Sequence, residues 1–79
     1  MNWNYRIILH DTVTTPYATI HEVYYDKKGE ITSWTTEPIS IVGEDSKDVI
    51  SILKTITIDL EQPELKESEL ARSLKIKVD

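Results

Sequence analysis

The strongest constraint on the fold is a predicted β-hairpin in the first half of the chain. Residues 17–25 are rich in β-branched and aromatic side chains, which favour strands. They are followed by Asp26-Lys27-Lys28-Gly29, where aspartate suits the first turn position and Gly29 can adopt the left-handed conformation that closes a type I turn with a bulge. Residues 30–36 then form the returning strand, which ends before Pro38.

A further strand is predicted before the hairpin. Residues 5–10 have the same β-branched and aromatic character, and the polar segment 11–16 separates them from the second strand. The three strands should therefore form an antiparallel meander.

A helix is predicted after the meander. Asp45 or Ser46 can cap its first turn, and Asp48 adds negative charge where the helix dipole favours it. Residues 54–60 also alternate with period two and suit a strand, but the capped start favours a helix to about residue 60. Its apolar face should carry Val49, Ile50, Leu53, Ile56, Thr57 and Leu60.

The composition changes near Pro63. Residues 1–63 carry the whole net charge of −5, whereas acidic and basic groups balance over residues 64–79. Pro63 suits the start of a second helix over 64–74, and residues 74–78 suit either an edge strand or a frayed tail. We therefore expect a single β-β-β-α domain over 1–63, of the α+β class, in which the helix packs on one face of a three-stranded meander. A C-terminal extension, helical or frayed, follows over 64–79.

Length and composition exclude several classes of protein. With 79 residues, a chain buries only about 60% of its unfolded surface, which leaves little room for an enclosed active site. The absence of cysteine excludes a disulfide scaffold and a cysteine-ligated zinc site. Negative charge disfavours direct nucleic-acid binding, and no apolar run approaches the ~20 residues of a membrane helix. The N-terminus lacks an export signal, which predicts a cytoplasmic protein without a membrane partner.

Two groups of side chains could carry chemistry. His10 and His21 lie on adjacent predicted strands and could approach each other, as in a metal site or a proton shuttle. Glu22 cannot complete such a site because neighbouring residues of a strand face opposite sides. We expect the histidines to pair with cross-strand polar groups, and the acidic residues at 44, 45 and 48 to cap the helix. We therefore expect no enzyme, no catalytic residues, no metal and no cofactor.

The predicted strands carry apolar residues on both faces. One helix can cover only one of them, so the other should expose aromatic and aliphatic groups, which commonly mark a partner surface. We expect a homodimer formed through the sheet or its edge, with a further protein partner also open. The predicted interaction surface comprises Tyr5, Ile8, Ile20, Tyr24, Tyr25 and Trp34.

Several segments carry a resemblance to known families. The strings Asn4-Tyr5-Arg6-Ile7-Ile8 and Ile20-His21-Glu22-Val23-Tyr24-Tyr25-Asp26, followed by Gly29, Trp34, Pro38 and Gly43-Glu44, resemble a family of small uncharacterised bacterial proteins with an NYR(V/I)…IHEVYYD…G…P…GE pattern. That resemblance covers about residues 2–65 and implies no activity. The β-β-β-α order and the Gly-Glu-Asp-Ser helix entry resemble, more weakly, HicB-like antitoxin domains.

These observations predict a small, non-catalytic protein-interaction or regulatory module that self-associates. The alternative is an antitoxin-like module that neutralises a small basic protein, since opposite charges speed the association of two proteins.

Overall fold

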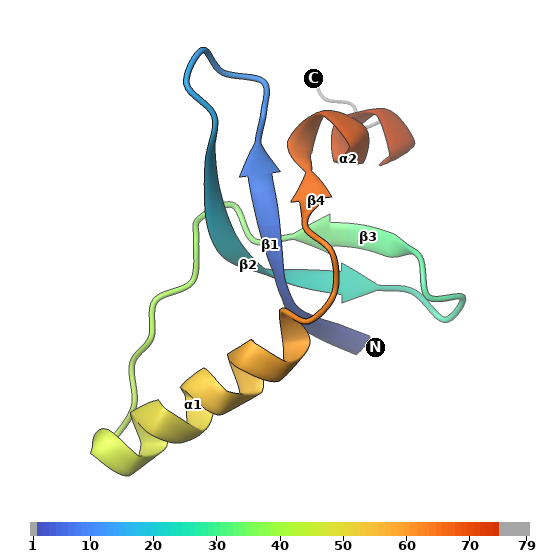
Figure 1. Ribbon diagram of the computed structural model, residues 1–79. Coiled ribbons are helices and arrows are strands. Elements are labelled where there is room, and N and C mark those ends of the chain that lie inside the picture. Colours follow the sequence, from blue (N-terminus) through green and yellow to red (C-terminus); the bar gives the residue numbers. More distant parts are fainter. Residues whose placement is uncertain (1, 75–79) are drawn as a thin grey trace.

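The computed structural model describes residues 2–74, which form a four-stranded curled sheet and two helices (Figure 1). Strands β1 (Asn2–His10) and β2 (Tyr17–Tyr25) pair antiparallel along their full length. Strand β3 (Ile31–Trp34) pairs antiparallel with the end of β2. Strand β4 (Leu65–Lys66) lies parallel to β1, and the strand order is β3-β2-β1-β4. The α+β class and the antiparallel meander are confirmed.

The predicted hairpin turn is also confirmed. Gly29 has a φ of +83°, and its N–H donates to the carbonyl of Asp26 at 3.0 Å. The Asp26 carboxylate accepts hydrogen bonds from the backbone N–H groups of Lys28 and Glu30. Aspartate and glycine therefore fix this turn by local chemistry, which is why the sequence reveals it.

The predicted count of three strands is wrong, because the segment after Pro63 adds a fourth. Leu65 and Lys66 pair with Ile8 and Leu9, and helix α2 (Glu67–Leu74) begins only after this pairing. A two-residue parallel bridge depends on a distant strand and has no local signal of its own. The predicted strand over 74–78 lies outside the described residues, except for residue 74, which ends α2.

Helix α1 spans Ser46–Asp59, which confirms the helical interpretation of residues 54–60. The Asp45 carboxylate accepts from the N–H of Asp48 at 2.9 Å and caps the first turn. The Asp48 carboxylate in turn accepts from the N–H of Glu44, so two acidic side chains satisfy donors at this helix entry. Glu44 itself takes part through its backbone.

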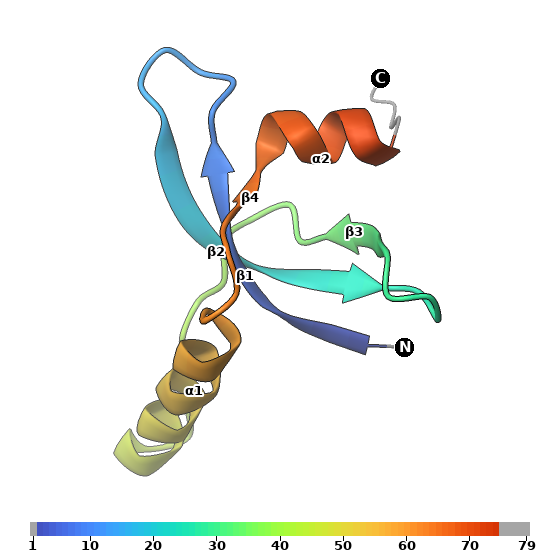
Figure 2. The ribbon, with the colours of Figure 1, turned by 45° about the vertical axis from the view of Figure 1, so that its right-hand side comes forward.

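The expected packing of this helix on one sheet face is wrong. Helix α1 projects away from the sheet and approaches β1 only near its C-terminal end (Figures 1 and 2). There the Asp59 carboxylate accepts from the N–H of Tyr5, and Ile56 is the one residue of α1 that is buried. The short connection to β4, residues 60–64, holds this end of α1 beside the middle of β1.

Helix α2 covers the sheet instead. Leu70 forms the core with Ile8 and Val23, and the half-buried Leu65 packs against this cluster. Residues on both sides of Pro63 therefore contribute to one core.

The two sheet faces differ in burial. Strand residues alternate between faces, so the buried Arg6, Ile8, His21 and Val23 all lie on the face beneath α2. The opposite face has no fully buried residue along β1 and β2. We call it the open face, and it comprises Trp3, Tyr5, Ile7, Leu9, Ala18, Ile20, Glu22 and Tyr24.

Candidate functional site

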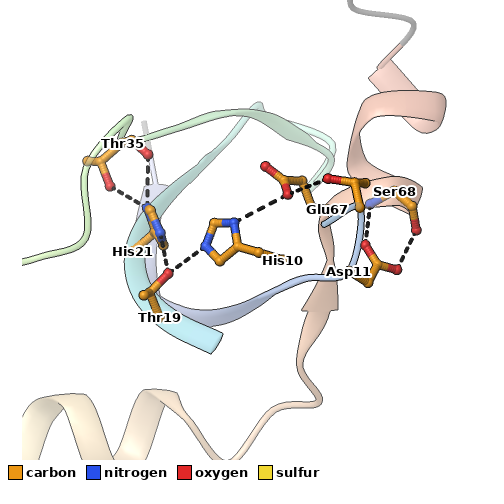
Figure 3. A network of polar contacts seen from close by, with 8 residues as sticks. His10, Asp11, Thr19, His21, Thr35, Glu67 and Ser68 are labelled. Atoms are coloured by element: carbon orange, nitrogen blue, oxygen red, sulfur yellow. Dashed lines mark hydrogen bonds and ion pairs between the residues drawn. The ribbon is translucent and has the colours of Figure 1, made fainter. Parts of the chain in front are cut away.

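A continuous chain of polar contacts crosses the sheet beneath α2 (Figure 3). Nε2 of His10 lies 2.7 Å from the Thr19 hydroxyl, and the same hydroxyl lies 2.8 Å from Nε2 of His21. Nδ1 of His21 lies 2.9 Å from the backbone carbonyl of Thr35. At the other end, Nδ1 of His10 lies 3.3 Å from the Glu67 carboxylate of α2. We call these five residues the histidine relay.

The expected approach of the two histidines is confirmed, with ring centroids 5.6 Å apart. They come together because antiparallel register places Arg6 opposite His21 and Tyr17 opposite His10, with Thr19 between the two rings. His21 is only 2% exposed, and all four ring nitrogens of the pair have polar neighbours. The sequence did not reveal Glu67, which reaches His10 from a helix 57 positions along the chain.

A second polar contact fastens the start of α2. The Asp11 carboxylate accepts hydrogen bonds from the N–H of Ser68 at 3.0 Å and from its hydroxyl at 2.7 Å. The Ser68 hydroxyl and N–H lower the pKa of Asp11, since both bonds favour the charged carboxylate. Asp11 thus acts as a helix cap supplied from the β1–β2 loop, beside the Thr12 hydroxyl that donates to Glu67.

The open face carries two tyrosines with altered acidity. The Tyr24 hydroxyl donates to the Glu22 carboxylate at 2.5 Å, and this bond raises the pKa of Tyr24. Burial raises the pKa of Tyr5, and the charges of Glu22 and Asp59 add to the effect. Both phenols therefore stay neutral well above physiological pH, and Glu22 provides negative charge on an otherwise apolar surface.

The six predicted surface residues divide between the two faces. Tyr5, Ile20 and Tyr24 lie half-buried on the open face. Tyr25 and Trp34 pack against the core beneath α2. Ile8 is 1% exposed and belongs to the core, so it is not available to a partner. The sequence showed mixed character on both faces, but only the position of α2 determines which face is covered.

Helix α1 exposes an apolar surface that includes Ile50, Leu53 and Thr57 from the predicted buried face. Ile50, Leu53 and Ile58 are 52%, 43% and 65% exposed, and with Lys54 and Thr57 they line a shallow depression of about 400 Å³. We call these five residues the α1 stripe. The predicted helix face is thus divided, since Ile56 turns toward the sheet while its predicted companions at 50 and 53 face solvent.

Within residues 2–74, no group of three or more histidine or carboxylate side chains is arranged to hold a metal ion. Neither of the two helices described is long and apolar enough to cross a membrane. Comparison of the chain with protein-family models, with curated proteins and with solved structures found no match.

Proposed function

We propose that the protein is a small non-catalytic interaction module that self-associates, with a second copy of the chain as its partner. The single observation that carries this proposal is the α1 stripe, which presents three large aliphatic side chains to solvent on a helix that projects from the body. An exposed apolar patch of this kind commonly marks an interaction surface.

The same chain offers a complementary surface. The open face of the sheet is apolar and incompletely covered, and Trp3 at its margin is 47% exposed. If α1 of each copy packs on the open face of the other, both surfaces are covered at once, as twofold symmetry allows. Lys54 of the stripe and Glu22 of the open face have opposite charges, which favours this arrangement.

The test is the molar mass in solution, measured by light scattering after size exclusion over a wide range of protein concentration. We expect a dimer for the natural chain and a monomer for Leu53→Glu, which places a charge in the α1 stripe. Thr55→Glu is the matched control, because it adds the same charge to an exposed position on another side of α1. A monomer at every concentration for the natural chain contradicts self-association.

A second candidate is an antitoxin-like module that binds a small basic protein. The net charge of −5 favours it, because opposite charges accelerate association. A chain that stays monomeric alone, but forms a stoichiometric complex with a small basic protein encoded beside it, supports this second function.

A further inference from the structure

We propose that the histidine relay is a one-proton switch, which fastens the first turn of α2 to the sheet more tightly at mildly acidic pH than at higher pH. This inference goes beyond the proposed function and does not depend on self-association. It follows from the number of protons that the observed contacts require.

The backbone carbonyl of Thr35 determines which nitrogen of His21 carries a proton. A carbonyl oxygen can only accept, so Nδ1 of His21 must carry a proton and donate to it at 2.9 Å. In a neutral His21 the other nitrogen, Nε2, then has a free lone pair. It accepts the proton of the Thr19 hydroxyl, 2.8 Å away.

The Thr19 hydroxyl then determines which nitrogen of His10 carries a proton. Thr19 has a single proton, which it has given to His21, so Nε2 of His10 must donate to the Thr19 oxygen at 2.7 Å. A neutral His10 then has no proton on Nδ1. Nδ1 lies 3.3 Å from a carboxylate oxygen of Glu67, so a neutral ring brings two acceptors close together without a proton between them.

One added proton satisfies every contact. Protonation of His10 at Nδ1 turns the contact with Glu67 into an ion pair and leaves the other bonds unchanged. In the reverse arrangement, Thr19 donates to His10 and His21 holds the second proton. That state also requires one proton more than two neutral rings, but it places the charge on a side chain that is only 2% exposed. The added proton therefore belongs on His10.

Few other charges face this ring. Glu67 approaches it from α2, whereas β2 contributes His21 and Tyr17, whose ring stacks on His10 with centroids 4.5 Å apart. Asp11 follows in the chain, but Ser68 occupies its carboxylate, and the charge of Lys66 on β4 acts on Asp11. The carboxylate of Glu67 is thus the acidic partner that holds the proton on His10.

The relay is coupled to α2 because Glu67 is its first residue. Imidazole side chains generally change charge between about pH 5 and 8. When the proton leaves, the ion pair between His10 and Glu67 is lost, and the Glu67 side chain is 37% exposed. The start of α2 then keeps the Asp11 cap, the hydrogen bond from Thr12 to Glu67, the β4 pairing and the core, so α2 is held more tightly below the transition than above it.

The test is amide hydrogen exchange of α2, expressed as protection factors and measured by NMR at about pH 5.5 and about pH 8. We expect protection of the α2 amides to be about two- to fivefold higher at the lower pH, as for a partly exposed ion pair. The ring resonances of both histidines should change with one common midpoint, because Thr19 joins them. Equal protection at the two pH values overturns the proposal.

Two variants separate the relay from ordinary packing. In Glu67→Gln the amide can donate to a neutral His10, so no added proton is needed and protection should be the same at both pH values. In Thr19→Val the link between the rings is lost, so the two histidines should have separate midpoints. A Glu67→Gln protein that keeps the pH difference of the natural chain also overturns the proposal.

Discussion

The guanidinium of Arg6 donates to the backbone carbonyl of Pro63 at 2.9 Å, which joins the middle of β1 to the connection between α1 and β4. Its other terminal nitrogen donates to the Tyr25 hydroxyl at 2.9 Å, and Tyr25 donates onward to Asn4. Arg6 is 8% exposed, and its two terminal nitrogens bind groups from two distant parts of the chain, whereas its buried Nε has no hydrogen-bond partner among the described residues. It fixes where the chain turns toward β4.

Replacement of Arg6 by lysine should destabilise the fold although the charge is kept. An ammonium group cannot reach both Tyr25 and Pro63 in the way that a planar guanidinium does. We expect the free energy of unfolding to fall by about 1–3 kcal/mol, as measured by urea denaturation. Lys47→Arg, at an exposed position of α1 outside the α1 stripe, is the control and should change it by less than about 0.5 kcal/mol. Equal effects of the two changes would show that the paired donors of the planar guanidinium do not contribute to the free energy of unfolding.

Truncation of the core should have a much larger effect than the same truncation on α1. Ile8→Ala leaves a cavity beside Val23 and Leu70, and we expect a loss of about 2–5 kcal/mol in the free energy of unfolding. Ile58→Ala removes the same atoms from a side chain that is 65% exposed, so it should change the stability of the monomer by less than about 0.5 kcal/mol. Urea denaturation at low protein concentration checks both values. Similar losses for the two variants would contradict the assignment of the core.

The hairpin turn offers a test of backbone strain without a steric clash. Gly29 has a φ of +83°, and a Cβ built on it meets no atom within 4 Å. Gly29→Ala should therefore lower stability only through the left-handed conformation, by about 1–2 kcal/mol. Gly29→Asn should have a smaller effect, because asparagine tolerates this conformation better than alanine does. Thermal unfolding followed by circular dichroism compares the two, and an unchanged midpoint in Gly29→Ala would contradict a strained turn.

Acid should weaken the cap that Asp11 provides for α2. The hydrogen bonds from Ser68 lower the pKa of Asp11 in the folded chain below the ordinary value of 3.8. The hydrogen bonds from Ser68 contribute fully to stability at pH values above the pKa of Asp11 in the unfolded chain. Their contribution is lost as the pH falls through the lowered pKa of Asp11 in the folded chain. Asp11→Asn keeps an acceptor but does not titrate. The free energy of unfolding of this variant should therefore fall less steeply in acid than that of the natural chain. Urea unfolding at several pH values measures the slopes, and parallel slopes would exclude this role of Asp11.

Local chemistry accounts for the elements that the sequence predicted correctly. The turn at Asp26–Gly29, the cap at Asp45 and the strand over residues 17–25 each depend on residues within a few positions of one another. The approach of His10 and His21 could be foreseen because the two residues lie on adjacent strands of the predicted meander.

The position of each helix and the fourth strand were decided only by tertiary structure. Leu65 forms a strand because it pairs with Ile8, and α2 rather than α1 covers the core because Leu70 packs between β1 and β2 side chains. An apolar pattern shows that a helix has a face to bury, but not which surface will bury it. The short connection after α1 holds that helix at one end, so the α1 stripe remains exposed and Glu67 reaches His10. The sequence determined the first three strands, the hairpin turn, and α1 with its cap. Long-range packing determined β4, the cap of α2, which apolar surface stayed open and which proton the histidine relay requires.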